Sequence, residues 1–321
     1  MSTNCGGPAG RGWPDRETDP ARRAFLKKAV AAAAVAAAGR AGPTDAASGV
    51  GEETGLPQIA LGEHSISRLI CGANCFNGGS HLSVFVDRQM REYYTPDRIV
   101  GTLRRCMEVG INAFQSELLN EDVYRRAREG GGKLHFISLG HGDDEGHLRR
   151  LLELGTIGVA HHGEVTDNLF KTGQFDKVHE YLKRVRDSGM QVGVSTHMPE
   201  VVDAVESNGW DVDFYMTCVY ERHRSADELR ALLGHVPIPV REVYLTEDPP
   251  RMFKAMRQTS RPCLAFKILA AGRLSDRPEW VEQAFRETFA SIKPTDGVIV
   301  GIFDRYSDQP AECAALVRKY A

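Results

Sequence analysis

The chain has 321 residues, of which 42% are hydrophobic and 26% are charged, and its formal net charge is -3. This composition is typical of a globular protein with one large domain or two smaller ones. The sequence has no basic stripe that would indicate nucleic-acid binding. A small-molecule substrate is therefore the better expectation.

The first 55 residues differ in character from the rest. Residues 22–28 read RRAFLKK, and residues 29–38 consist of alanine and valine. This apolar run is too short to span a bilayer but fits the apolar core of an export signal. The paired arginines resemble a twin-arginine signal, which export machinery reads and which is not a stable membrane anchor. We predict a signal peptide and linker over residues 1–55 and a periplasmic or secreted protein; the alternative is a disordered tail.

Seven cysteines are present, and Cys5 lies in the predicted signal. The other six are too sparse for a disulfide scaffold and lack the CxxC spacing of a zinc ribbon. Cys106 and Cys313 lie in predicted helices and are expected to be buried thiols. A bridge between Cys71 and Cys75 remains an open alternative.

From residue 56 onward, short apolar runs alternate with amphipathic stretches. Such apolar runs are typical of strands that are covered on both faces. The predicted strands are residues 68–72, 111–115, 134–139, 156–161, 191–195, 213–218, 263–268 and 297–301. The predicted helices are residues 95–109, 120–129, 144–154, 174–188, 198–207, 226–233, 248–259, 279–291 and 308–320.

Eight strands, each followed by a helix within about 265 residues, predict an α/β fold of the (β/α)₈ TIM barrel type over residues 56–321. Residues 58–70 are expected to form an N-terminal β-hairpin that closes the bottom of the barrel and turns near Gly62. A doubly wound sheet is the alternative, but the first turn has no GxGxxG pattern. Active residues of such barrels lie at the carboxyl ends of the strands.

Histidines follow three consecutive predicted strands. They are His141, His162 and His197, with Glu117 or Glu164 as a possible oxygen donor. Imidazole and carboxylate suit zinc, manganese or iron, and three protein ligands plus water form an open catalytic site. We therefore predict a divalent metal site in which His162 is a ligand or acid–base group beside Glu164. The alternative for each histidine is a hydrogen-bonded loop residue.

A lysine, Lys267, stands within the apolar run CLAFKIL. A buried lysine needs a partner or a function. It could form a Schiff base, act as a base or stabilise an enolate, or it could pair with a carboxylate across the barrel. Residues 76–94 are long for a connection and are expected to be a lid loop, with a surface excursion as the alternative. Asp167 is expected to cap the loop that follows His162.

Several short motifs occur in a set order along the chain. They are the hairpin with the first strand, Gly110-Ile111-Asn112, Gly193-Val194-Ser195, Tyr220 after the sixth strand, and Gly-Ile-Phe-Asp at residues 301–304. Together these motifs resemble the aldo-keto reductase superfamily over most of residues 56–320. The resemblance implies a (β/α)₈ barrel and, for ordinary members, NADPH-dependent carbonyl reduction by an Asp-Tyr-Lys-His set.

The sequence departs from that set at three of its four positions. Gln115 stands at the aspartate position, residues 118–120 contain no tyrosine, and residues 138–141 contain no lysine. Only the histidine is present, as His161 or His162. Carbonyl reduction needs a tuned proton donor, so these departures argue against ordinary reductase chemistry.

Three functions remain open. The leading hypothesis is metal-assisted lyase, isomerase or hydrolase chemistry on a sugar-like carbonyl compound, with Lys267 or a second carboxylate as the base. The second is an NADP-dependent oxidoreductase, with His162 and Tyr220 beside the nicotinamide and Arg305 near the 2′-phosphate. The third is a non-catalytic periplasmic protein that binds a ligand in the emptied cofactor groove.

Overall fold

The computed structural model describes residues 55–117, 121–142, 145–238 and 242–321. The described residues belong to one compact unit, Glu53–Ala321. The predicted export signal therefore lies outside the described residues. Within them, no helix has the length and apolar character needed to cross a bilayer.

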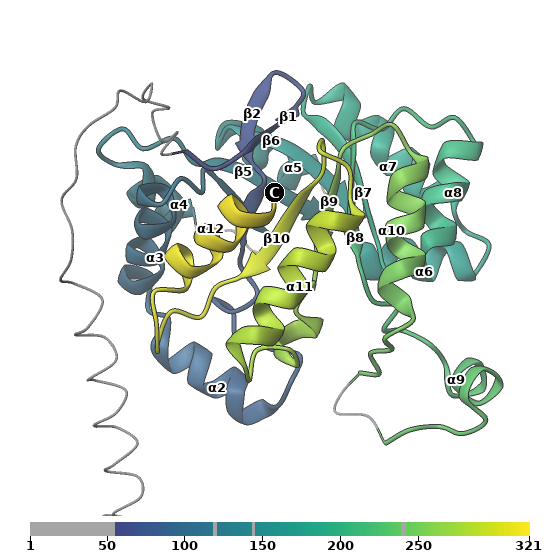
Figure 1. Cartoon of the computed structure of the whole chain (residues 1–321). Coiled ribbons are helices and arrows are strands. Elements are labelled where there is room, and N and C mark those ends of the chain that lie inside the picture. Colours follow the sequence, from purple (N-terminus) through teal and green to yellow (C-terminus); the bar gives the residue numbers. More distant parts are fainter. Residues whose placement is uncertain (1–54, 118–120, 143–144, 239–241) are drawn as a thin grey trace, which may run out of the picture. The chain divides into compact units, whose positions relative to one another are not determined.

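Eight parallel strands close into a barrel in the order β10-β3-β4-β5-β6-β7-β8-β9 (Figure 1). They are β3 (Leu69–Gly72), β4 (Ala113–Ser116), β5 (His135–Gly140), β6 (Thr156–His161), β7 (Gln191–Thr196), β8 (Phe214–Cys218), β9 (Cys263–Phe266) and β10 (Gly297–Gly301). The predicted α/β TIM barrel is confirmed, with shifts of a residue or two at several strand ends. The carboxyl ends of all eight strands face one side of the barrel, because the strands are parallel.

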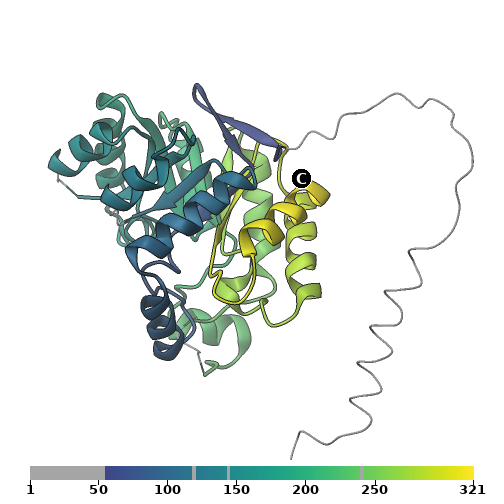
Figure 2. The same cartoon turned by 90° about the vertical axis from the view of Figure 1, so that its left-hand side faces the viewer.

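The N-terminal hairpin covers the starts of the strands. Its strands β1 (Gln58–Leu61) and β2 (His64–Ser67) pair in antiparallel register and turn at Gly62, which has a φ of 59°. The backbone N–H of Ser67 donates to Oδ1 of Asn112 at 2.7 Å, just before β4. The hairpin is thus tied to the amino-terminal end of the barrel, opposite helix α2 (Figures 1 and 2).

Helices surround the barrel, and two of them were not predicted. The described α-helices are α2 (Val84–Tyr93), α3 (Pro96–Glu108), α4 (Glu121–Arg128), α5 (Glu145–Glu153), α6 (Gly163–Lys171), α7 (Asp176–Asp187), α8 (Pro199–Ser207), α9 (Ala226–Leu233), α10 (Asp248–Gln258), α11 (Pro278–Ser291) and α12 (Gln309–Tyr320), with a short 3₁₀ turn η2 (Ala270–Gly272). The unpredicted helices are α2 and α6.

Helix α2 corrects the prediction of a structureless lid over residues 76–94. Ser83 caps the helix, because its Oγ accepts a hydrogen bond from the backbone N–H of Val86. Buried Asp87, in the first turn, accepts hydrogen bonds from the backbone N–H and hydroxyl of Ser80. Capping and this buried carboxylate therefore organise a segment whose apolar spacing is weak.

The six described cysteines are free thiols. Cys71 and Cys75 do not form the disulfide that was left open as an alternative. Cys106 and Cys313 are buried, as predicted. Burial raises the pKa of the Cys313 thiol to about 12, which keeps it protonated and unreactive at neutral pH.

The inside of the barrel is filled by apolar side chains from the strands and the hairpin, including Ile59, Leu61 and Phe214. Strand β7 leaves room for one of these rings, because its Gly193 has no side chain. A Cβ built on Gly193 would lie 2.4 Å from Cζ of Phe214. Phe214 is fully buried, so its ring has little space into which it could move.

Replacing Gly193 with alanine should therefore destabilise the barrel. We expect the Gly193→Ala variant to lose about 1–3 kcal/mol of unfolding free energy through overpacking, measured by urea denaturation. Gly101 in α3 is the matched control, because a Cβ there meets nothing within 4 Å. Gly101→Ala should gain up to about 1 kcal/mol from helix propensity. Equal stability of Gly193→Ala and the wild type would contradict this account of the packing.

Candidate functional site at the carboxyl ends of β7, β8 and β9

The four predicted metal ligands lie in two groups. Nε2 of His162 is 3.5 Å from Oε2 of Glu117, and the ring centroids of His141 and His162 are 5.9 Å apart. His197 instead pairs with Asp167. In the part of the chain that the structure describes, no three His, Cys, Asp or Glu side chains are placed to hold one metal ion. Metal binding thus stays a prediction, and the described residues do not form a set of ligands for it.

His197 and Asp167 form a buried pair after β7. Nδ1 of His197 lies 2.7 Å from Oδ2 of Asp167, whose carboxylate also accepts from the hydroxyl of Thr196 at 2.5 Å and from the backbone N–H of His197. Burial lowers the pKa of His197 well below its usual value and raises the pKa of Asp167 to about 6. At neutral pH we therefore assign an ionised Asp167 and a neutral His197 with its proton on Nδ1.

This assignment leaves Nε2 of His197 as a lone-pair acceptor. Nε2 makes no hydrogen bond to any described residue, although the histidine is only 4% exposed. A carboxylate that fixes the tautomer of an imidazole, with the second nitrogen free, is the arrangement of a general base. The pair can accept a proton from a bound molecule.

Helix α6 carries Asp167 to His197, which corrects the prediction that Asp167 caps a loop. The helix begins at Gly163, where a Cβ would lie 2.9 Å from Oγ of Ser195 and 3.3 Å from Cε1 of His197. Glycine thus permits the close approach of α6 to the end of β7. Val165 and Leu169, four residues apart, were a sequence signal for this helix that the histidine cluster obscured.

Arg222 follows β8 and pairs through Nη1 with the carboxylate of Glu242. Glu242 also contacts Nδ1 of His81 at 3.0 Å and accepts from the hydroxyl of Tyr244 at 2.8 Å. Burial alone would raise the pKa of Glu242, but the His81 hydrogen bond and the Arg222 charge hold it well below its usual range. Glu242 is therefore an ionised carboxylate with three protein partners.

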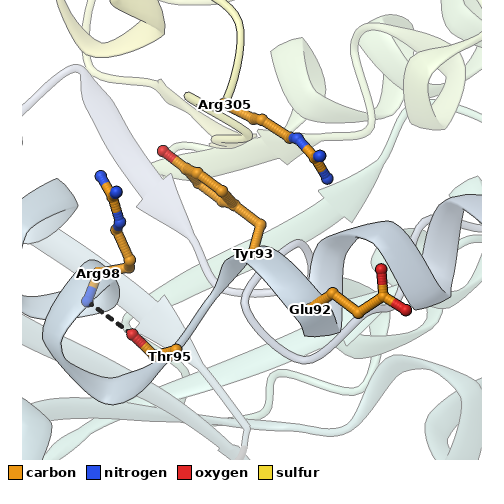
Figure 3. A pocket seen from close by; sticks show the side chains of 5 residues that line it. All are labelled: Glu92, Tyr93, Thr95, Arg98 and Arg305. Atoms are coloured by element: carbon orange, nitrogen blue, oxygen red, sulfur yellow. Dashed lines mark hydrogen bonds between the residues drawn. The ribbon is translucent and has the colours of Figure 1, made fainter.

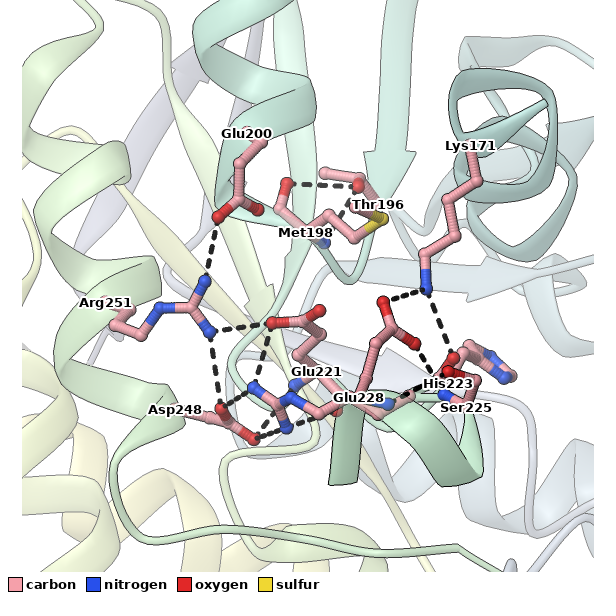
Figure 4. Close-up of polar contacts among 11 residues, drawn as sticks. Lys171, Thr196, Met198, Glu200, Glu221, His223, Ser225, Glu228, Asp248 and Arg251 are labelled. Carbon is pink, nitrogen blue, oxygen red and sulfur yellow. Dashed lines mark hydrogen bonds and ion pairs between the residues drawn. The ribbon is translucent and has the colours of Figure 1, made fainter. Parts of the chain in front are cut away.

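The loop that carries Arg222 and His223 is anchored on both sides. The Arg224 guanidinium donates to the carboxylates of buried Asp248 at 2.5 Å and Glu221 at 2.9 Å. Nζ of Lys171 donates to the backbone oxygen of His223 at 3.3 Å. Figure 4 shows Asp248 and Glu221 on one side of this loop and Lys171 on the other. These contacts fix where the loop presents its side chains.

Lys267 was predicted to lie inside a strand. It lies directly after β9, which ends at Phe266. Its φ of 60° places a non-glycine residue in the left-handed region, a strained conformation that is often found at functional sites. The side chain is half-buried, and no described residue forms a hydrogen bond or ion pair with its Nζ. The alternative of a carboxylate partner across the barrel is therefore not found among the described residues.

The surroundings of Lys267 favour the neutral amine. Burial is the largest cause and lowers its pKa to about 8; the nearby charges of Arg222 and Arg273 act in the same direction. Cys218 and Glu242 oppose the shift without cancelling it. Roughly a tenth of Lys267 is thus an uncharged nucleophile at pH 7, and about half is uncharged near pH 8.

Aromatic contacts join the three strand ends into one site. The His223 ring stands perpendicular to the His197 ring with centroids 4.9 Å apart, and the Phe266 ring lies 5.7 Å from His197. Glu164, which was predicted to lie beside His162, lies near this group. Its Oε2 is 3.7 Å from Nη2 of Arg222 and 4.0 Å from Nε2 of His223.

Tyr220 and Arg305 lie in other surroundings. Tyr220 is 8% exposed, its ring packs 5.1 Å from that of Tyr244, and burial raises its pKa to about 12. These features are typical of a packing residue. Arg305 lines a pocket of about 370 Å³ near the start of α3 (Figure 3). The other lining residues are Glu92, Tyr93, Thr95 and Arg98.

No protein-family model matches the chain, and no curated protein sequence matches it. Several solved barrel structures are similar at low identity. A truncated 3-deoxy-D-arabino-heptulosonate 7-phosphate synthase from Thermotoga maritima is 13% identical, with a TM-score of 0.48 over 83% of this chain and 91% of that chain. The glycerol dehydrogenase AKR11B4 from Gluconobacter oxydans is 13% identical, with a TM-score of 0.45 over 84% of this chain and 97% of that chain.

A mandelate oxidase with benzoyl-formic acid is 14% identical, with a TM-score of 0.47 over 84% of this chain and 76% of that chain. These neighbours are enzymes with different activities, one of which is an aldo-keto reductase by its designation. The similarity is therefore limited to the barrel fold and assigns no activity and no family to this chain.

The electrostatic account of Lys267 can be tested by amine labelling. We expect the rate of Lys267 modification by acetic anhydride, followed by mass spectrometry of its peptide, to reach half its maximum near pH 8. In Arg222→Met, the profile should move to higher pH, because a positive charge near the amine is lost. Lys254→Met, at an exposed position on α10, is the control and should leave the Lys267 profile unchanged. A wild-type profile centred above about pH 10 would contradict the account.

Proposed function

We propose that this protein is an exported enzyme that acts on a carbonyl compound by lyase or isomerase chemistry, with Lys267 as the amine that forms a Schiff base. The supporting observation is Lys267 itself: a half-buried amine with a left-handed backbone, a pKa lowered to about 8 and no described partner. Lysines that are desolvated and placed near other cations are activated in this way. A sugar-like substrate remains part of the proposal.

The first step is the addition of Nζ of Lys267 to the carbonyl carbon. The carbonyl oxygen takes up protons and leaves as water, and an iminium ion remains. This cation accepts the electron pair that is released when a neighbouring C–C or C–H bond breaks. The enamine that results takes up a proton on carbon, which restores an iminium ion. Water then adds to the iminium carbon, and the product leaves with the amine restored. No external oxidant or reductant is needed.

The proton transfers fall to His197. Its Nε2 can remove a proton from the substrate, either from the hydroxyl group in a C–C cleavage or from carbon in an isomerisation. Asp167 holds Nδ1 and stabilises the imidazolium that forms. Asp167 is thus a positioning residue, and Asp167→Asn should lower turnover by about 10²- to 10⁴-fold, because the amide favours the wrong tautomer.

Two other versions of the function remain proposals. In a metal-assisted version, His162, Glu117 and His141 are the predicted ligands that lie together. In an NADP-dependent version, Arg305 and Arg98 provide two guanidinium groups beside Tyr93 that suit a phosphate group. Neither version accounts for the unpartnered amine of Lys267.

Reductive trapping tests the proposed chemistry. The protein is incubated with cyanoborohydride and a panel of carbonyl compounds that includes dihydroxyacetone, glyceraldehyde, hydroxyacetone and pyruvate. We expect at least one of them to give a covalent adduct on the peptide that contains Lys267, detected by mass spectrometry. Because an iminium is the trapped species, labelling should rise with pH as the amine loses its proton.

Variants and additives separate the alternatives. Lys267→Met should form no adduct in that peptide, whereas Lys254→Met should be labelled like the wild type. Labelling that a metal chelator abolishes would favour the metal-assisted version. No adduct with any carbonyl, together with quenching of NADPH fluorescence by the protein, would overturn the proposal in favour of the NADP-dependent version.

A further inference from the structure

The guanidinium of Arg222 has one edge without a hydrogen-bond acceptor. Its side chain is 9% exposed, and Nη1 is occupied by Glu242. Nε is buried and has no hydrogen-bond partner among the described residues. Nη2 makes no hydrogen bond there either, and it lies 3.7 Å from a carboxylate oxygen of Glu164. Leaving a buried charged donor unpaired is costly, so this edge indicates an acceptor that binds from outside.

The unoccupied edge has the geometry that recognises an oxyanion. Nε–H and one Nη2–H of a guanidinium point in the same direction and can bind both oxygens of a carboxylate. Glu242 cannot serve here, because its contact is with Nη1 and it also contacts His81 and Tyr244. Glu164 is 61% exposed and can swing away at little cost. The edge is thus open to a carboxylate that displaces Glu164.

The position of Arg222 relates this edge to the proposed nucleophile. Arg222, Lys267 and His197 follow the adjacent strands β8, β9 and β7. The charge of Arg222 is close enough to influence both Lys267 and His197. Three nitrogen groups without a hydrogen-bond partner among the described residues, the Arg222 edge, Lys267 Nζ and His197 Nε2, therefore share one part of the barrel mouth.

We infer that the substrate carries a carboxylate next to its carbonyl group, as in a 2-oxo acid, and that the Nε–Nη2 edge of Arg222 binds this carboxylate. The inference rests on the proposed function, because it assumes that Lys267 attacks the carbonyl carbon. The guanidinium holds the carboxylate while the amine adds to the neighbouring carbon. Its positive charge also favours an anionic substrate over a neutral one of the same shape.

Two matched probes test the inference. Pyruvate and pyruvamide have nearly the same shape, but only pyruvate carries the charge. With cyanoborohydride present, we expect half-maximal labelling of Lys267 at a pyruvate concentration about 10- to 100-fold lower than that of pyruvamide, as for hydrogen bonds to charged groups. Equal concentrations for the two probes in the wild type would overturn the inference and leave the Schiff-base function standing.

Two variants test whether Arg222 and Glu164 determine the preference for pyruvate over pyruvamide. Arg222→Lys keeps a positive charge beside Glu242 but lacks the two-donor edge, so the preference for pyruvate should fall to a few-fold or less. Glu164→Gln removes the competing charge, so pyruvate should label at an equal or lower concentration. Arg230→Lys, on the exposed face of α9, is the matched control and should retain the full preference. Full preference in a folded Arg222→Lys variant, verified by circular dichroism, would overturn the assignment.

A measurement without covalent chemistry separates the two proposals. In Lys267→Met, pyruvate should still raise the thermal unfolding midpoint and pyruvamide should not. If pyruvate stabilises this variant but never labels the wild type at Lys267, the Schiff-base function fails while the carboxylate site stands. If neither probe stabilises the variant and both label the wild type equally, the carboxylate site fails alone.

Discussion

The chemistry at the mouth of the barrel depends on where the carboxylate of Glu242 is held. Glu242 is engaged by Arg222, His81 and Tyr244, and is therefore not available as a close partner for Lys267. A lysine paired with a carboxylate keeps its proton at neutral pH. Because Glu242 is engaged elsewhere, Lys267 experiences burial and two guanidinium charges without a compensating ion pair. The nucleophilic character of Lys267 therefore follows from the pairing of Glu242 with other residues.

The pairing of Glu242 with Arg222 requires that the loop carrying Arg222 stays in place. Arg224, two residues further on, is held by buried Asp248 and by Glu221. A buried ion pair contributes little net stability but is costly to break, so it serves well to set the position of a loop. Arg273 adds a second constraint, since it donates to the backbone oxygens of His81 and Glu242. Connections after β3, β8 and β9 are thereby joined around the amine.

The fold was largely predictable from the sequence, whereas the site was predictable only in part. Continuous apolar runs such as residues 297–301 mark buried parallel strands, because both faces of such strands are covered. The helix α6 was missed because His161 and His162, which precede it, and Glu164, in its first turn, resemble a polar loop. Its apolar positions Val165 and Leu169 carry the helical signal, but two positions form a weak pattern.

The residues of the site were easier to predict than the contacts between them. His197 was a candidate because it follows a predicted strand, and Lys267 because it stands within an apolar run, but the partner of His197 was sought among other histidines. Its actual partner, Asp167, reaches it only because α6 packs closely at Gly163. Glu242 and His81 were not predicted at all, since they come from connections whose course depends on tertiary contacts far apart in the sequence.

The most direct test of Lys267 as the nucleophile is a crystal structure of the protein after reduction with cyanoborohydride in the presence of pyruvate. The account predicts electron density continuous from Nζ of Lys267 to the trapped carbon, with the carboxylate within about 3 Å of Nε and Nη2 of Arg222. It also predicts that Nε2 of His197 faces the trapped molecule. An unmodified Lys267, with pyruvate bound elsewhere in the barrel or covalently attached to another lysine, would contradict the account.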